Sequence, residues 1–342
     1  MAVLKDNFRI IKILHYFALL PIIRLKVRKM EAIKFMRKRT AFFILAFFIF
    51  VSSAAFAGYK IYRGYSQLKK KEALLEKRKV AWGKLKAVLD DRITGFDGQL
   101  GIVIKDLETN WEIDFNKSAL FPSASLVKVP ILLSYFYAVQ EGKMRLDDTV
   151  RLKPSERVEG SKVLGGLPAG YLFSVEKLFD PMITISDNTA ANILIDWMGR
   201  DTLNAYFGKL GLRNTNLSRK MMAFADRRGG KENYTTAEDM AYILEKLYQR
   251  RFINKDVSER CLGFLKQQKI NDRIPRELPG TVSVAHKTGL ENHICHDVGI
   301  VFTEKGDFLI CVLAKHQDRF AYHTKKLISD IALLTYNYYQ GL

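Results

Sequence analysis

The stretch from Thr40 to Ala57 is the feature that most restricts how this chain can fold. Its 18 residues carry no charge, and the basic run Arg37–Arg39 precedes them directly. At 1.5 Å per residue they form a helix of about 27 Å, just long enough to cross the apolar core of a bilayer. The last three residues also have the small-x-small pattern of a signal-peptide cleavage site. We therefore predict either a retained signal anchor or a signal peptide that is cleaved near Ala57.

The basic charge of the chain is concentrated on the N-terminal side. Residues 1–89 contain 21 Lys and Arg against 4 Asp and Glu, whereas residues 90–342 contain 34 against 32. The formal net charge of +19 therefore arises almost entirely in the first quarter. The remainder has no dense basic stripe of the kind that binds phosphates, which argues against nucleic acid as a partner.

The chain is predicted to contain four segments. Residues 1–39 form a basic segment that is cytoplasmic, or not native if translation begins at Met36. Residues 40–57 contain the signal anchor or signal peptide, and residues 58–92 a basic linker and a first helix. Residues 93–342 form the globular domain. We expect this domain to lie outside the cytoplasm, either tethered to the membrane or secreted after cleavage.

The hydrophobic pattern of residues 93–342 predicts the fold class. Strand-like runs cover 101–106, 111–115, 282–286, 297–302 and 308–314. Helical patterns cover 125–139, 174–198, 236–249 and 320–339. Strands at both ends with helices between them favour an α+β fold, in which an antiparallel sheet is flanked by helices and accompanied by an all-helical subdomain.

A serine and a lysine three residues apart, Ser125 and Lys128, begin the first predicted helix of the domain. The same spacing recurs at Ser66 and Ser174, so it carries little weight alone. Here an apolar run follows, which would bury Lys128 on the helix face that carries Ser125. Burial disfavours the charged ammonium and makes a neutral amine base accessible beside the hydroxyl. The N-terminus of the helix offers N–H groups to developing negative charge.

Two further short motifs are individually ordinary. Ser186-Asp187-Asn188 is compatible with simple helix capping. Lys287-Thr288-Gly289 follows the predicted strand 282–286, where it is either a plain strand exit or a carboxylate-binding edge. In the second interpretation Gly289 lets a substrate backbone approach closely.

The three motifs in this order resemble the set found in class A β-lactamases and penicillin-binding proteins. The segments Phe121–Lys128, Ile183–Asn192 and His286–Val301 all look like that family's, and the resemblance extends over about residues 66–342. It implies that Ser125 is acylated as a serine ester and that Lys128 assists as proton acceptor. It also implies that Ser186 passes the proton to the leaving nitrogen.

The resemblance further implies the substrate contacts. Asn188 would bind an amide side chain of the substrate, and Lys287 and Thr288 its carboxylate. The oxyanion would lie between the backbone N–H groups of Ser125 and Leu290. One such donor typically stabilises the transition state by about 3–4 kcal/mol. The implied reaction opens a β-lactam or a related cyclic or peptide amide, and it requires no metal and no organic cofactor.

One departure concerns the loop glutamate with which class A β-lactamases orient the deacylating water. Counting back from Tyr234 without gaps places Lys220 at that position. The nearest carboxylates, Asp226 and Glu232, are either placed in the site by a rearranged loop or are surface charges, and we favour the second interpretation. The acylation residues are thus complete while the usual residue for fast deacylation is missing, as in the poorly characterised β-lactamase-related serine hydrolases.

Three functions remain open at this point. The first is hydrolysis of β-lactams. The second is a penicillin-binding-type D-alanyl-D-alanine peptidase that acts on peptidoglycan stem peptides, or another cell-wall serine hydrolase with slow deacylation. The third is a non-catalytic, membrane-anchored binding module. The joint presence of all the motif residues favours an enzyme, with a β-lactam or stem peptide and, through residues 40–57, the membrane as partners.

The cysteines and neighbouring histidines do not indicate a metal site. Cys261, Cys295 and Cys311 are an odd number and form no disulfide framework, although a single bridge is compatible with them. His293 and His296 flank Cys295, but no second cluster completes a metal site. We interpret these histidines as loop residues.

Overall fold

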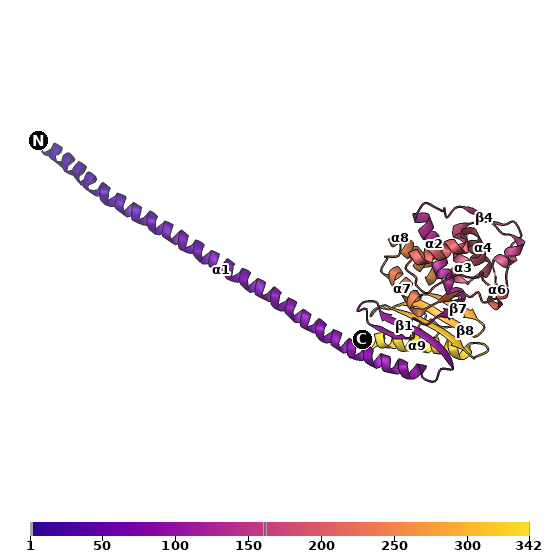
Figure 1. The fold of residues 1–342 in the computed structure, drawn as a ribbon. Helices are drawn as coiled ribbons and strands as arrows, with labels where there is room; N and C mark the ends of the chain where they lie inside the picture. Colours follow the sequence, from indigo (N-terminus) through magenta and orange to yellow (C-terminus); the bar gives the residue numbers. More distant parts are fainter. Residues whose placement is uncertain (1–2, 160, 162, 342) are drawn as a thin grey trace. The chain divides into compact units, whose positions relative to one another are not determined.

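The computed structural model describes residues 3–159, 161 and 163–341. It divides the chain into two compact units, Met1–Lys77 and Arg78–Leu342. Helix α1 (Val3–Ile93) makes up the first unit and continues into the second (Figure 1). Its solvent-exposed, uncharged stretch is long and apolar enough to cross a membrane. The predicted segment 40–57 is thus part of one long candidate membrane helix.

The second unit is built on a five-stranded antiparallel sheet. Its strands are β1 (Gly98–Asp106), β2 (Glu112–Phe115), β7 (Ser283–Glu291), β8 (Ile294–Phe302) and β9 (Phe308–His316). They are ordered β2-β1-β9-β8-β7, so that β7 is an edge strand. The first two and last three strands of the domain therefore join in one sheet, which confirms the predicted fold class.

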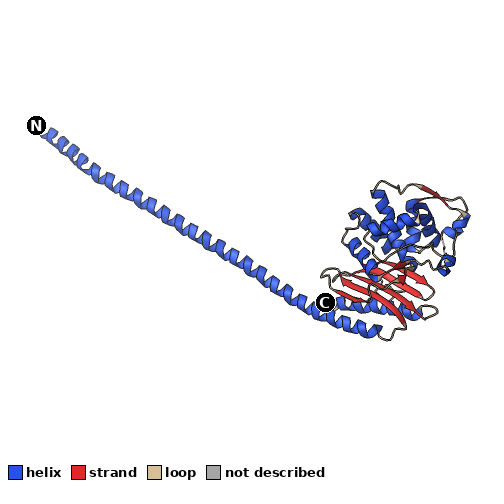
Figure 2. Cartoon of the chain, viewed as in Figure 1, coloured by secondary structure: helices blue, strands red, loops and turns tan. Residues whose placement is uncertain are grey.

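Both faces of the sheet are covered by helices (Figure 2). Alternate residues of a strand point to opposite faces, and Ile102 and Ile104 of β1 pack against residues 78–93 of α1 and against α9 (Tyr322–Gln340). Val103 lies between them in sequence and points to the opposite face of the sheet, where it belongs to a second hydrophobic core. Trp82, Leu85 and Leu89 are buried in the first core. Residues 78–92, which belong to the segment predicted as a basic linker and a first helix, lie in the second compact unit.

The second core is formed largely by the all-helical subdomain. Its helices are α2 (Lys128–Gln140), α3 (Phe179–Thr184), α4 (Asn188–Met198), α5 (Arg200–Lys209), α6 (Phe224–Arg228), α7 (Ala237–Tyr248) and α8 (Lys255–Lys266). Two short ribbons accompany them, β3 (Phe121–Pro122) with β6 (Tyr234–Thr235) and β4 (Thr149–Arg151) with β5 (Leu172–Ser174). The sequence patterns did not predict these ribbons, because strands of two or three residues have no measurable periodicity.

Three differences from the predicted element boundaries concern a motif. The predicted helix 174–198 is interrupted at Ser186, which has a left-handed backbone with φ of 60°. The strand predicted at 282–286 continues to Glu291, so Lys287-Thr288-Gly289 lies within the strand and not at its exit. Ser125 lies in a 3-10 turn, Ala124–Val127, and the α-helix begins only at Lys128.

Candidate active site

Ser125 is held in a tight turn between β3 and α2. The preceding residue, Ala124, has a φ of 44°, a conformation that residues other than glycine rarely adopt. Two contacts fix the entry to this turn: Ser123 N donates to the carbonyl of Asn233 at 2.7 Å, and the carbonyl of Pro122 lies 2.8 Å from His296 Nε2. Ser125 itself is half-buried, whereas the residues that follow it are buried. The turn therefore presents one hydroxyl on a rigid support.

Lys128 is fully buried one turn further along, as the sequence predicted. Its Nζ donates to the Ser186 carbonyl at 2.6 Å and to Asn188 Oδ1 at 2.7 Å, and it lies 3.1 Å from the Ser186 hydroxyl oxygen. Burial lowers the pKa of this amine well below its usual value, and the positive charge of Lys287 lowers it further. The structure thus brings two motifs together around one amine whose charged form is disfavoured.

Lys287 approaches the same serine from the sheet. Its Nζ donates to Ser186 Oγ at 3.1 Å and to the Thr288 carbonyl at 2.9 Å. Burial lowers the pKa of Lys287 to about 7, against an opposing effect of the Asp297 carboxylate. The Ser186 hydroxyl therefore lies at hydrogen-bonding distance from two buried amines, one from the helical subdomain and one from the sheet.

The corner 186–188 is shaped by the aspartate in its middle. Asp187 is buried and caps α4 by accepting from Ala190 N at 3.0 Å. Its other oxygen accepts from the N–H groups of Val163 and Leu164, both at 3.3 Å. The capping interpretation of this motif is therefore correct for Asp187. The cap also ends α3 and turns Ser186 and Asn188 toward Lys128.

Gly289 lies where β7 passes closest to the serine turn. A Cβ at this position would lie 3.2 Å from the His296 ring and 3.4 Å from the Cβ of Ala124. A side chain at this position would require the neighbouring atoms to shift by a few tenths of an ångström, so the glycine allows the strand and the turn to pack closely. Thr288 is buried and Leu290 is half-exposed at the edge of the sheet.

The loop 217–233 contains the largest departure from the sequence interpretation. Lys220 is half-exposed and pairs with Asp196 at 2.5 Å, and Asp226 is a half-exposed charge 3.6 Å from Lys231. Glu232, in contrast, is buried and pairs with Arg219 at 2.9 Å and with Arg227 at 2.8 Å. Its interpretation as a surface charge was therefore wrong. A buried arginine requires a carboxylate partner, and this one lies 13 residues away in sequence.

Two asparagines that the sequence analysis did not single out hold this loop. The side chain of Asn192 accepts from Met221 N at 2.8 Å and donates to the Met221 carbonyl at 3.0 Å. Asn233 accepts from the N–H groups of Ser218 and Arg219 at 2.7 and 2.9 Å. The position of Asn192, one helical turn after Asn188, was the available signal.

The histidine and cysteine side chains have structural surroundings. His296 is a buried residue of β8, not a loop residue; its Nε2 faces Pro122 O, and its Nδ1 accepts from Ala314 N at 3.1 Å. Burial lowers the pKa of His296 to about 4. All three cysteines are buried and free, so the single bridge does not form. Within the described part of the chain, no three His, Cys, Asp or Glu residues are grouped as a metal site.

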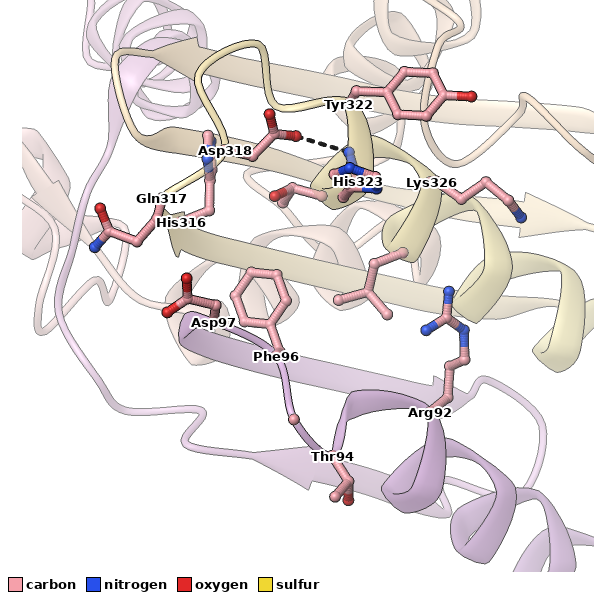
Figure 3. A pocket seen from close by; sticks show the side chains of 13 residues that line it. Arg92, Thr94, Phe96, Asp97, His316, Gln317, Asp318, Tyr322, His323 and Lys326 are labelled. Atoms are coloured by element: carbon pink, nitrogen blue, oxygen red, sulfur yellow. Dashed lines mark hydrogen bonds between the residues drawn. The ribbon is translucent and has the colours of Figure 1, made fainter.

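An open pocket of about 720 Å³ lies apart from these motifs. Figure 3 shows it between Phe96 and Asp97 on one side and the segment His316–Asp318 on the other, with His323 N donating to Asp318 at 2.8 Å. None of the motif residues lines this pocket. The candidate site is therefore defined by converging side chains and not by the size of a hollow.

Comparisons with known proteins identify the family and the fold of the chain. A model of the Beta-lactamase enzyme family matches residues 84–339. The β-lactamase VEB-1 of Pseudomonas aeruginosa is 24% identical over 263 residues, which are 71% of this chain and 86% of that protein. The solved structure of a β-lactamase from Sphaerobacter thermophilus is 29% identical, with a TM-score of 0.68 over 76% of this chain and 98% of that one.

A second group of solved structures shares the fold. PBP-A has a TM-score of 0.70 and 24% identity over 76% of this chain and 97% of its own. A variant of PBP-A has been solved as an acyl-enzyme complex with penicillin G. Because the family match extends over most of the sequence, the chain belongs to the Beta-lactamase enzyme family and is a β-lactamase-like serine hydrolase.

Proposed function

We propose that Ser125 is the nucleophile of this enzyme and forms a covalent acyl-enzyme with a β-lactam or a related cyclic or peptide amide. The observation that carries the proposal is the Ser186 hydroxyl, held 3.1 Å from both Lys128 Nζ and Lys287 Nζ. Such an arrangement is suited to moving a proton between an attacking hydroxyl and a leaving nitrogen. The three side chains Lys128, Ser186 and Lys287 come from segments that are distant in sequence.

The proposed acylation step uses these groups in turn. Neutral Lys128 takes the proton of the Ser125 hydroxyl as its oxygen bonds to the carbonyl carbon. The N–H groups of Ser125 and Leu290 stabilise the resulting oxyanion. When the tetrahedral intermediate collapses, the carbon–nitrogen bond breaks. Ser186 then delivers its proton to the leaving nitrogen and is reprotonated from Lys128, which restores the neutral amine.

The proposed substrate carries a carboxylate next to the scissile amide. Protonated Lys287 and the hydroxyl of Thr288 would bind this carboxylate by charge-assisted hydrogen bonds. The side-chain N–H group of Asn188, which lies beside Lys128, would donate to an amide carbonyl of the substrate. β-Lactams and the D-alanyl-D-alanine end of stem peptides share this layout. The acyl-enzyme known for a PBP-A variant with penicillin G supports the class of reaction by analogy.

Deacylation is proposed to be slow. The loop carboxylate Glu232 already pairs with two arginines, and Lys220 points to Asp196, so neither supplies a free base for water. We therefore expect benzylpenicillin to leave one long-lived penicilloyl group on the protein. Intact-protein mass spectrometry over time measures it. A transient adduct with fast turnover of a chromogenic cephalosporin would favour a β-lactamase instead, and no adduct at any time would contradict the proposal.

A cell-wall peptide is the alternative substrate that slow β-lactam turnover favours. A penicillin-binding-type peptidase would release the terminal D-alanine from muropeptides, whereas a dedicated β-lactamase would leave them intact. Chromatography of muropeptides after incubation with the protein distinguishes the two. A non-catalytic binding module would leave the muropeptides unchanged in this assay and would also form no adduct with benzylpenicillin.

The pH dependence of acylation should have an alkaline limb set by Lys287. Its pKa of about 7 means that the ammonium is present below this pH and is lost above it. The second-order rate of adduct formation with a carboxylate-bearing substrate should thus fall about tenfold per pH unit well above 7. Lys287→Arg stays charged and should lose this limb. A rate constant that is level from about two units below to two units above neutrality would contradict the assignment.

We also propose that residues 40–57 anchor the chain in a membrane, with residues 1–39 cytoplasmic and the domain from residue 93 outside. The uncharged stretch of α1 supports this placement. The full chain should sediment with membranes after carbonate extraction, and a variant that lacks residues 1–57 should be soluble. Recovery of the protein in the soluble fraction, at the smaller size expected from cleavage near Ala57, would favour the signal peptide.

A further inference from the structure

Four charged side chains join the loop 217–233 to the end of β7, and we name this cluster the arginine clamp. Arg219 is fully buried, and its Nη2 donates to both carboxylate oxygens of Glu291, at 3.0 and 3.1 Å. Arg227 Nη1 donates to Glu291 Oε2 at 3.0 Å. Glu232 completes the clamp through its pairs with Arg219 and Arg227. The carboxylate of Glu291 thus accepts hydrogen bonds from two guanidinium groups. This interaction is stronger than a single exposed ion pair.

The clamp lies beside two groups of the proposed site. Glu291 follows Leu290, whose N–H is one of the two proposed oxyanion donors. On the other side, Asn233 binds the backbone of Arg219, and its own carbonyl accepts from Ser123 N at 2.7 Å, two residues before the nucleophile. One loop therefore contacts both the strand end that carries Leu290 and the turn that carries Ser125.

We propose that Glu291 is a positioning residue that holds the N–H of Leu290 in place for the oxyanion. The inference rests on the proposed function of Ser125. Among the residues that the structure describes, strand β7 is the edge of the sheet and pairs only with β8, and Glu291 is its last residue. Strand ends with a neighbour on one side open most easily. Because arginines of the loop 217–233 hold the side chain of Glu291, they also restrain the backbone of Leu290 before it.

The charge balance of the clamp allows positioning to be separated from stability. Two arginines face two glutamates, so Glu291→Gln leaves one excess positive charge beside the buried Arg219, which destabilises the fold as well. The double variant Arg227→Gln with Glu291→Gln restores the balance, because Arg219 keeps Glu232. A purely structural role predicts that the double variant regains both thermal stability and activity. A positioning role predicts that it regains stability while acylation stays slow.

The experiment measures benzylpenicillin acylation of the full chain by intact-protein mass spectrometry, together with the midpoint of thermal unfolding. We expect Glu291→Gln and the double variant to lower the saturating acylation rate about tenfold or more, because a displaced oxyanion donor loses most of its effect. The half-saturating concentration should change less than about twofold, since substrate binding uses other groups. The double variant should unfold closer to the wild-type temperature than Glu291→Gln does.

The matched control is Glu112→Gln, which removes a glutamate that pairs with Lys117 at 2.6 Å on β2, at the opposite edge of the same sheet. It should acylate at the wild-type rate. Wild-type acylation by the double variant, or by Glu291→Gln itself, would overturn the inference and leave the proposed function intact. A wild-type chain that forms no adduct would overturn the proposed function and this inference with it.

Discussion

Replacement of the proposed nucleophile, Ser125→Ala, should abolish the penicilloyl adduct. Ser186 should not substitute, because its hydroxyl is held by two amines at the corner of the site and its proposed role is proton transfer. Removing a serine nucleophile lowers turnover by about 10⁶-fold in a well-studied hydrolase. The fold should be unaffected, since the change removes one half-buried oxygen.

A second Ser-x-x-Lys match in the same domain provides the control. Ser174 also precedes a lysine by three residues, but it is the last residue of β5, and Lys177 is exposed in the 3-10 turn Val175–Leu178. Ser174→Ala should acylate like the wild type. An adduct that persists in Ser125→Ala, located by peptide mapping to another residue, would contradict the assignment of the nucleophile.

Loss of the buried amine, Lys128→Met, should slow acylation by about 10²–10⁴-fold, the usual contribution of a general base. Methionine fills a similar volume, and burial already lowers the pKa of the amine that it replaces. The carbonyl of Ser186 and Oδ1 of Asn188 would each lose a donor, at a cost of about 1–3 kcal/mol per buried group. The variant should therefore be folded but less stable.

The pre-steady-state rate of adduct formation measures this effect, and Lys177→Met is its control. Lys128→Arg adds a second test, because a guanidinium remains charged at all accessible pH values and cannot accept the serine proton. It should be as slow as Lys128→Met. Rapid acylation by either variant would show that another group removes the proton.

Much of the fold could be predicted because its long elements carry their own signals. The five strands of the sheet and the helices at 236–249 and 320–339 follow hydrophobic periods that tertiary contacts reinforced. Boundaries next to the site were less predictable. Apolar residues continue across Ser186, so the pattern indicated one helix. The break arises from the Asp187 cap and from a left-handed residue, neither of which alters the hydrophobic period.

The candidate site could be listed from the sequence but not assembled from it. Short motifs identified Ser125, Lys128, Ser186 and Lys287, because their residue types and spacing are local properties. The burial of Glu232 in the loop 217–233 was predicted wrongly because it is not a local property of the sequence. Whether Glu232 is a surface charge depends on a buried arginine and on Glu291, 59 residues further along, and no local pattern encodes that contact.

The sequence by itself determined the class of fold and the chemical groups that are available for catalysis, since hydrophobic period, charge and motif spacing act over a few residues. Only the tertiary structure decided that one hydroxyl lies between two buried amines and that a loop is clamped to the edge strand. Both features depend on desolvation and on contacts between distant segments, and these exist only after the sheet and the helical subdomain have packed together.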